Sequence, residues 1–220
     1  MKRILIVIAL LCNVAAFSQN VEVTGGLNSN NFFDFQKNDG HYTSSYNSDY
    51  GYVIRVGIDN IKAGWMAFRF TLSYDKYSGE LTASDGGLGS GYTTNAKIDK
   101  SVISLGVFPL NFRIIDRIGL NFGFELSGLV SENINGTSSG WSAGTQHWSY
   151  DLNDKYDRYS SKFYFGLCGR IAYDFKISDK LIISPQYSYY LGLSDEFDEF
   201  PESTKAMRHY FCLGLKRKIK

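Results

Sequence analysis

The chain has almost no excess of charge of either sign. Its 220 residues include 23 lysines and arginines against 22 aspartates and glutamates, a net charge of +1 with histidine neutral. Without an excess of positive charge, the chain has no long-range electrostatic attraction to nucleic acid or to a strongly acidic partner. A nucleic-acid-binding function is therefore not expected.

Long apolar runs are also scarce. Ile4–Leu11 is apolar, but it is too short to cross a bilayer as a helix. Lys2-Arg3 precedes it and Ala16–Ser18 follows it, which together form the three parts of a secretory signal peptide. We expect residues 1–18 to be removed by cleavage near Ser18/Gln19. No later segment is apolar enough for a membrane-spanning helix.

Cysteine occurs only three times. Cys12 lies in the leader, and lipidation there would need a small residue at the preceding position, which is Leu11. Cys168 and Cys212 fall on the polar faces of strands that should be second neighbours. Two strand spacings come to roughly 9–10 Å, too far for a disulfide, so two free thiols are favoured over a disulfide.

The motifs of soluble enzymes are missing too. There is no Cys/His spacing for zinc, and Gly86-Gly87 lacks the strand–helix context of a nucleotide-binding glycine loop. The sequence therefore predicts no cofactor and no metal.

The abundant feature is an alternation of apolar and polar residues with period two, typical of β-strands. In the segment 118–126 every even position is a large apolar residue, while the odd positions are Gly119, Asn121, Gly123 and Glu125. Eight segments alternate in this way: Val21–Leu27, Tyr50–Ile58, Trp65–Tyr77, Lys97–Phe108, Ile118–Val130, Ser161–Lys176, Leu181–Leu193 and Ala206–Lys216.

The connections between these segments are alternately long and short. The long ones are Ser29–Asp49, Ser78–Asn95, Ser131–Ser160 and Ser194–Thr204; the short ones lie near Asn60–Gly64, Pro109–Arg117 and Ile177–Asp179. This rhythm is typical of outer-membrane barrels with long extracellular loops and short periplasmic turns. We predict an all-β fold for residues 19–220: an eight-stranded, antiparallel, up-and-down transmembrane β-barrel.

Aromatic residues fall near the expected ends of the strands. Amphipathic rings prefer the headgroup level of a bilayer, although aromatics also simply favour strands. The predicted aromatic girdle comprises Tyr52, Trp65, Tyr74, Tyr173 and Tyr189.

Two short segments carry a family resemblance. Gly25-Gly26-Leu27-Asn28 in the first strand and Leu213-Gly214-Leu215-Lys216 in the last, with the hairpin rhythm between them, resemble the small outer-membrane β-barrel proteins of Bacteroidetes-type bacteria. This porin-like group includes the PorT-like proteins. The resemblance implies an outer-membrane location in a Gram-negative bacterium and, more narrowly, a part in assembling a secretion machine.

Charged residues on the polar faces should point into the lumen. An eight-stranded barrel is only wide enough to be filled by its own side chains, and an unpaired charge there is costly. We expect an Arg/Glu network that plugs the lumen, with Glu125 at its centre. The arginines are Arg55, Arg69, Arg170 and Arg208, and Glu22, Asp75 and Asp174 also point inward. A narrow conducting path or a ligand socket is the alternative.

One loop motif suggests chemistry. His147-Trp148-Ser149 resembles the His/Ser pair of lipid A deacylases, which are also eight-stranded barrels. Such a site needs an acid to orient the base, and no glutamate follows at a convincing position. The acidic stretch Asp195–Glu202 could hold divalent cations, but it has no EF-hand spacing and we interpret it as a solvated loop.

The sequence thus predicts a non-enzymatic outer-membrane protein with a structural or surface-interaction role. Its expected partners are outer-membrane lipid, lipopolysaccharide and other envelope proteins, and we expect a monomer. The alternatives are a PorT-like secretion component, a lipid A-modifying enzyme, and a soluble carrier of the lipocalin type whose apolar faces would point inward.

Overall fold

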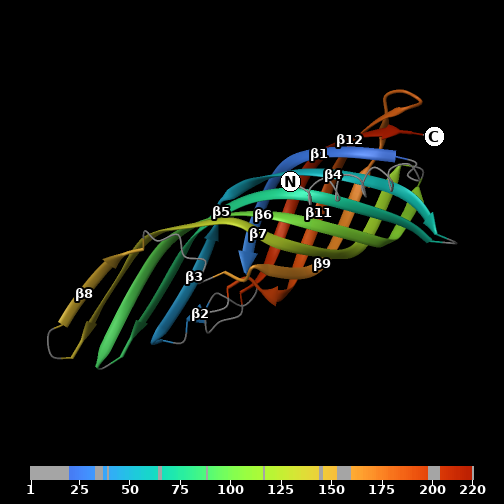
Figure 1. Ribbon diagram of the computed structural model, residues 1–220. Helices are drawn as coiled ribbons and strands as arrows, with labels where there is room; N and C mark the ends of the chain where they lie inside the picture. Colours follow the sequence, from blue (N-terminus) through green and yellow to red (C-terminus); the bar gives the residue numbers. More distant parts are fainter. Residues whose placement is uncertain are drawn as a thin grey trace, which may run out of the picture.

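A computed structural model describes residues 20–32, 37–38, 40–63, 66–87, 89–115, 117–143, 146–152, 160–197 and 204–219. The described chain is built of β-strands (Figure 1). No helix among these residues is long and apolar enough to cross a membrane. The predicted signal peptide and its cleavage point lie outside the described residues.

Eight strands form a closed antiparallel ring, as the alternation predicts. Around the ring the order is β1 (Asn20–Phe32), β4 (Tyr50–Ala63), β5 (Met66–Gly86), β6 (Ser90–Ile115), β7 (Ile118–Ser142), β9 (Phe163–Tyr173), β11 (Leu181–Asp195) and β12 (Lys205–Lys218). β12 closes the ring on β1, where Asn20 lies opposite Lys218. Asn20 also lies opposite Asp59 on β4, so both ends of the barrel domain lie at the end of the barrel that carries the short turns.

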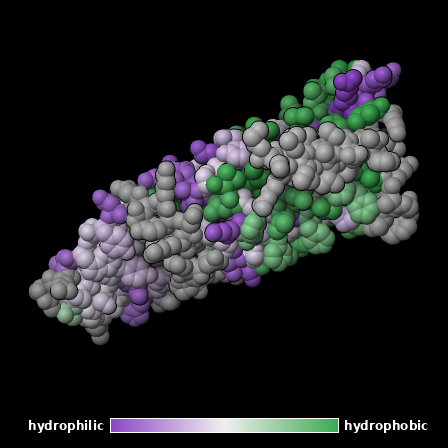
Figure 2. Space-filling model, in the orientation of Figure 1, coloured by the Kyte–Doolittle hydropathy of each residue, from purple (hydrophilic) through white to green (hydrophobic). Residues whose placement is uncertain are grey.

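The two faces of the barrel have the predicted orientation. Outward positions carry exposed apolar side chains such as Val56, Phe124 and Leu213, while inward positions carry buried Glu22 and Arg55. Figure 2 shows the apolar surface gathered over the barrel. An apolar outer face around a charged interior suits a bilayer and is the reverse of a lipocalin-type pocket.

The cysteine prediction is confirmed. Cys168 on β9 and Cys212 on β12 are both buried and both free thiols. β11 pairs with each of these two strands and so lies between them.

Three of the predicted loops are largely strand instead. β5, β6 and β7 run on well past the barrel, and they gain β3 (Tyr42–Ser48) and β8 (Gln146–Asp151) as further neighbours. A short strand, β2 (Lys37–Asn38), pairs with β3, and β10 (Phe175–Lys176) pairs with β11 at the turn end. The order β2-β3-β5-β6-β7-β8 defines the projecting sheet, seen at the lower left of Figure 1.

The physical reason for these long strands is a buried row on one face of the projecting sheet. Leu81 and Ala83 on β5 and Ala96 and Ile98 on β6 are buried, whereas their sequence neighbours are exposed or half-buried polar residues. The Gly, Ser and Thr residues near this row favour the prediction of loops. The period-two spacing of the four apolar residues nevertheless predicts strands.

Candidate functional site: the charged lumen and the projecting sheet

At the turn end of the lumen, one carboxylate holds two arginines. Glu22 Oε2 lies 2.6 Å from Arg69 Nη1, and Glu22 Oε1 accepts a hydrogen bond from Arg170 Nη2 at 3.0 Å. Gln186 Nε2 also donates to Glu22 Oε1, at 2.8 Å, and Asp59 pairs with Arg69 at 2.5 Å. These side chains come from five different strands of the ring. The cluster therefore cross-links the barrel interior.

In the middle of the lumen, Arg55 is paired more loosely. Its Nη2 lies 3.9 Å from Glu125 Oε2, and its guanidinium lies 5.1 Å from the ring centre of Tyr210. Asp75 is fully buried on β5 and interacts electrostatically with both Arg55 and Glu125. Within the described part of the chain, both oxygens of Glu125 lack a hydrogen-bond partner from the protein. Buried polar groups of this kind are normally satisfied by internal water.

At the loop end of the lumen, Glu196 is the acceptor. Arg208 Nη2 donates to Glu196 Oε1, and the Tyr77 hydroxyl donates to Oε2 at 2.6 Å. Lys100 Nζ lies 3.9 Å from Glu196 and 3.5 Å from Glu132. The guanidinium of Arg208 also lies about 5 Å from three tyrosine ring centres, a favourable cation–π arrangement.

The structure thus places all five predicted lumen residues inside the barrel, but in three clusters. Glu125 meets Arg55 and is not the centre of a single network; Arg69 and Arg170 converge on Glu22, and Arg208 on Glu196. The charges form three clusters because these residues lie at different heights along the barrel axis. A carboxylate reaches only the arginines at its own level, and strand register sets those levels.

The described part of the acidic stretch, residues 195–197, is not simply a solvated loop, which corrects that expectation for these residues, while residues 198–202 lie outside the described residues. Glu196 and Phe197 are buried at 1% and 2% exposure. The Phe197 ring centre lies 3.5 Å from Lys100 Nζ, and its backbone forms a β-bridge with Ser160. The Phe197 backbone nitrogen donates to Thr204 Oγ1 at 3.0 Å. Glu196 and Phe197 therefore lie inside the loop end of the lumen.

Sequence reasoning missed Lys100 and Glu196 for different reasons. Lys100 and the inward-facing Ser104 are both even-numbered residues of β6, so the alternation of this strand predicts that Lys100 also faces the lumen. Glu196 lies just past the end of β11, where no periodicity applies.

The predicted girdle tyrosines lie on the outer face of the barrel. Tyr52 is 44% exposed, and its ring centre lies 6.2 Å from that of Tyr74 on the neighbouring strand. Tyr189 packs against His209 with ring centres 5.1 Å apart, and Tyr173 packs against Phe175 at 4.5 Å. Trp65 lies outside the described residues.

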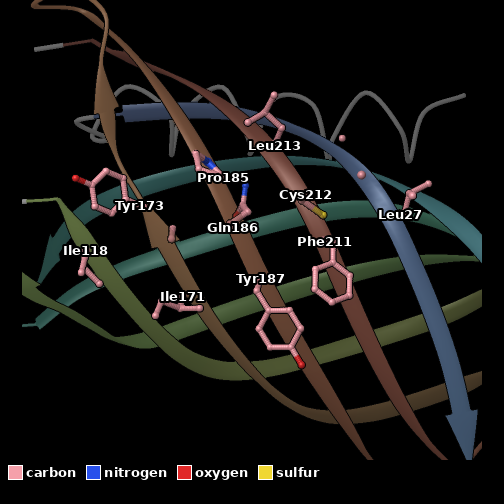
Figure 3. Close-up of a pocket in the computed structure, with 13 residues that line it drawn as sticks. Leu27, Ile118, Ile171, Tyr173, Pro185, Gln186, Tyr187, Phe211, Cys212 and Leu213 are labelled. Carbon is pink, nitrogen blue, oxygen red and sulfur yellow. The ribbon is translucent and has the colours of Figure 1, made fainter.

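The outer wall of the barrel is hollowed where small residues flank Leu213. Gly25 on β1 and Pro185 on β11 lie opposite Leu213 on either side. They leave a groove of about 660 Å³ along which Tyr187 and Phe211 also lie (Figure 3). None of the described residues that line it carries a charge. The groove lies within the apolar outer face and offers no acid–base chemistry.

The His147/Ser149 pair lies on β8, at the free edge of the projecting sheet. The two residues are exposed on the same face, about 7 Å apart along the strand. In the described part of the chain neither side chain forms a hydrogen bond, and no group of three or more His, Cys, Asp or Glu residues is arranged to hold a metal. The pair therefore lacks the hydrogen-bonded geometry of a nucleophile and its base.

The sequence of residues 17–198 matches a family described as "outer membrane protein beta-barrel domain". The chain belongs to this family. An outer-membrane β-barrel domain accounts for the closed ring, the apolar outer face and the charged lumen together. A search of curated proteins finds no match.

Several solved structures of bacterial proteins are similar to this chain. The attachment invasion locus protein Ail of Yersinia pestis is 12% identical, with a TM-score of 0.40, covering 92% of this chain and 99% of that one. Neisserial surface protein A is 12% identical, with a TM-score of 0.41 and coverages of 90% and 97%. The outer membrane protein OprG of Pseudomonas aeruginosa is 11% identical, with a TM-score of 0.44 and coverages of 90% and 96%.

Proposed function

We propose that this protein is a non-enzymatic surface-interaction protein of the outer membrane. The barrel acts as an anchor with a plugged lumen, and the projecting sheet presents a binding surface to the exterior. Lipid chains fill the outer groove at Leu213, and the tyrosines near the ends of the barrel lie at the membrane interfaces.

The observation that carries this proposal is the change of chemistry along the outer face of β5, β6 and β7. On β5 the outward positions are apolar or aromatic as far as Tyr74 and polar from Lys76 onward, while the strand continues to Gly86. At about 3.3 Å per residue this is roughly 40 Å of strand beyond the apolar band. Figure 2 shows the same change, with the hydrophilic surface over the projecting sheet. A sheet of this length outside the membrane is the part available to partners.

The test compares the full chain with a version that has a shortened sheet. Residues 81–96 are replaced by an Asn-Gly turn, because Glu80 and Lys97 already lie opposite each other and a two-residue turn can join them. Both proteins are placed in lipid nanodiscs and applied to immobilised extracellular-matrix proteins and polysaccharides. The full chain should bind at least one surface that the shortened protein does not. Equal binding by both, or none, would overturn the proposal.

The lipid A enzyme is the rival function with named residues. Under our proposal, Ser149→Ala leaves the lipid A of expressing cells unchanged, because Ser149 has no activating base. Mass spectrometry of extracted lipid A, with cells carrying an empty vector as the reference, measures this. An acyl chain lost from lipid A in wild-type cells and kept with Ser149→Ala would favour the enzyme instead.

A PorT-like part in assembling a secretion machine is the narrower version of the proposal. It is supported by the resemblance of Gly25–Asn28 and Leu213–Lys216 alone. Deleting the gene and measuring secreted protein in the medium tests it, and unchanged secretion would leave only the broader surface role.

A further inference from the structure

A row of hydroxyl groups crosses the projecting sheet near its tip. Thr43, Ser84, Thr93, Ser139 and Ser149 lie opposite one another in successive strands, from β3 through β5, β6 and β7 to β8. They share the face that continues the outer wall of the barrel. Neighbouring strands are about 4.8 Å apart, so the row presents one hydroxyl at each such step. Within it, Thr43 Oγ1 and Ser84 Oγ share a hydrogen bond of 2.6 Å.

An aromatic platform lies beside this row. Trp141 on β7 is two residues beyond Ser139 on the same face, and it is 41% exposed. Gly91 lies opposite it on β6, and a Cβ at Gly91 would lie only 2.9 Å from Trp141 Nε1. The absence of that side chain lets the indole ring lie against the β6 backbone. Gly91 therefore leaves the space that this position of the ring requires.

Together these residues line a shallow cavity of about 720 Å³. His147 and His41 stand at its two sides, and the Nδ1–H of His41 donates to the Gly86 carbonyl at 3.1 Å. Asp85, Tyr92 and Trp148 also border the cavity, but alternation turns their side chains to the opposite face, where the Trp148 ring covers Gly140. The side chains that face the cavity are thus hydroxyls, imidazoles and one indole.

This chemistry excludes several ligand classes. None of the described residues that line the cavity is a lysine or arginine, which does not suit a nucleic acid or a sulfated polymer. None of these described lining residues is Val, Ile or Leu either, which does not suit a lipid chain. Hydroxyl and imidazole groups both donate and accept hydrogen bonds, and an exposed aromatic ring offers a flat apolar surface. A sugar ring has the same two features: hydroxyls at its edge and an apolar face of C–H groups.

We propose that this face of the projecting sheet binds a neutral glycan, with a sugar ring stacked on Trp141 and its hydroxyls bonded to the row from Thr43 to Ser149. The inference rests on the proposed surface-interaction function and gives its ligand class. An extended polysaccharide lying along the row would contact successive strands with successive sugar units.

The experiment uses the full chain in nanodiscs and measures binding to dextran and mannan as neutral polysaccharides and to heparin as an anionic one. Trp141→Ala should lower the affinity for a neutral polysaccharide by about ten-fold, since an aromatic contact at the centre of the site is lost. Thr93→Val should lower it by a smaller factor, because one hydroxyl in the row is replaced by a methyl group of nearly the same size.

Trp148→Ala is the matched control. Trp148 has the same exposed fraction, 41%, on the opposite face, where it stacks on Tyr150 with ring centres 5.3 Å apart. It should leave affinity unchanged. Three results would each overturn the inference: binding of heparin alone, binding lost with Trp148→Ala but kept with Trp141→Ala, or no binding of either neutral polysaccharide. If the projecting sheet still binds an immobilised protein, the surface-interaction function stands while the glycan assignment fails.

Discussion

Glu22 and Glu125 are both buried carboxylates in the same lumen, yet their surroundings differ. Glu22 lies within 3.0 Å of nitrogens from Arg69 and Arg170, whereas the pair between Glu125 and Arg55 is 3.9 Å long. Breaking a tight buried ion pair leaves an uncompensated charge, which is far more costly than loosening a distant one. The two residues therefore form a natural comparison.

Glu22→Gln should destabilise the barrel by about 3–5 kcal/mol, because two arginines lose their shared negative partner. Glu125→Gln, the matched control, should cost clearly less. Urea unfolding of the protein in lipid vesicles, followed by tryptophan fluorescence, measures both. If Glu125→Gln is the more costly change, the arginines do not depend on Glu22 as the distances imply.

At the scale of the element, β7 has two chemical environments on one face. Phe122 and Phe124 lie in the apolar band, while Thr137 and Ser139 lie on the projecting part of the same strand. The period is two in both parts, so period alone does not separate them, although a register shift at Val130 changes the outward positions from even to odd numbers. The change from large apolar to polar side chains marks where the strand leaves the lipid.

Phe122→Arg should cost roughly 2–4 kcal/mol, the penalty of a charge facing lipid near the bilayer midplane. Thr137→Arg places the same side chain on the same face outside the band and should change stability by less than about 0.5 kcal/mol. The free energy of unfolding in vesicles is again the measurement. A harmless Phe122→Arg would mean that this face does not contact lipid.

At the scale of the whole molecule, the lumen is occupied along its length. The Glu22, Glu125 and Glu196 clusters lie at successive heights, and Phe197 is buried beside Lys100 at the loop end. An eight-stranded barrel leaves no room for a wide channel around such side chains. We therefore expect the barrel to pass no solutes, as the proposed role of an anchor for the projecting sheet requires.

Vesicles containing the purified protein should accordingly show no swelling in solutions of small sugars, with a known porin as the positive control. The same preparation should run as a monomer in a gel and change mobility on boiling, as folded barrels do. Rapid swelling would show that the side-chain clusters do not close the lumen, and an unshifted band from the soluble fraction would contradict the barrel anchor itself.

The number of strands in the ring, their antiparallel order, the inward set of arginines and the outward apolar face were all predictable from the sequence. Each depends on period-two alternation, which is a local property of a strand. The length of β5, β6 and β7 was underestimated for two reasons. Gly, Ser and Thr are frequent in loops, and the pairing of β3 with β5 and of β8 with β7 cannot be predicted from a local sequence pattern. The buried position of Glu196 likewise follows from its contact with Arg208 and Tyr77 rather than from its own segment.

The sequence by itself determined that the chain alternates, and hence that one face of each strand is apolar and the other polar. The tertiary structure alone decided which charges meet. Arg170 and Glu22 are 148 positions apart and Tyr77 and Glu196 are 119 apart, so they become neighbours only when the ring closes in one register. The hydroxyl row from Thr43 to Ser149 has the same origin, because it exists only where five strands align. Alternation depends only on residues that are adjacent in the sequence, whereas register is set by the closure of the whole sheet.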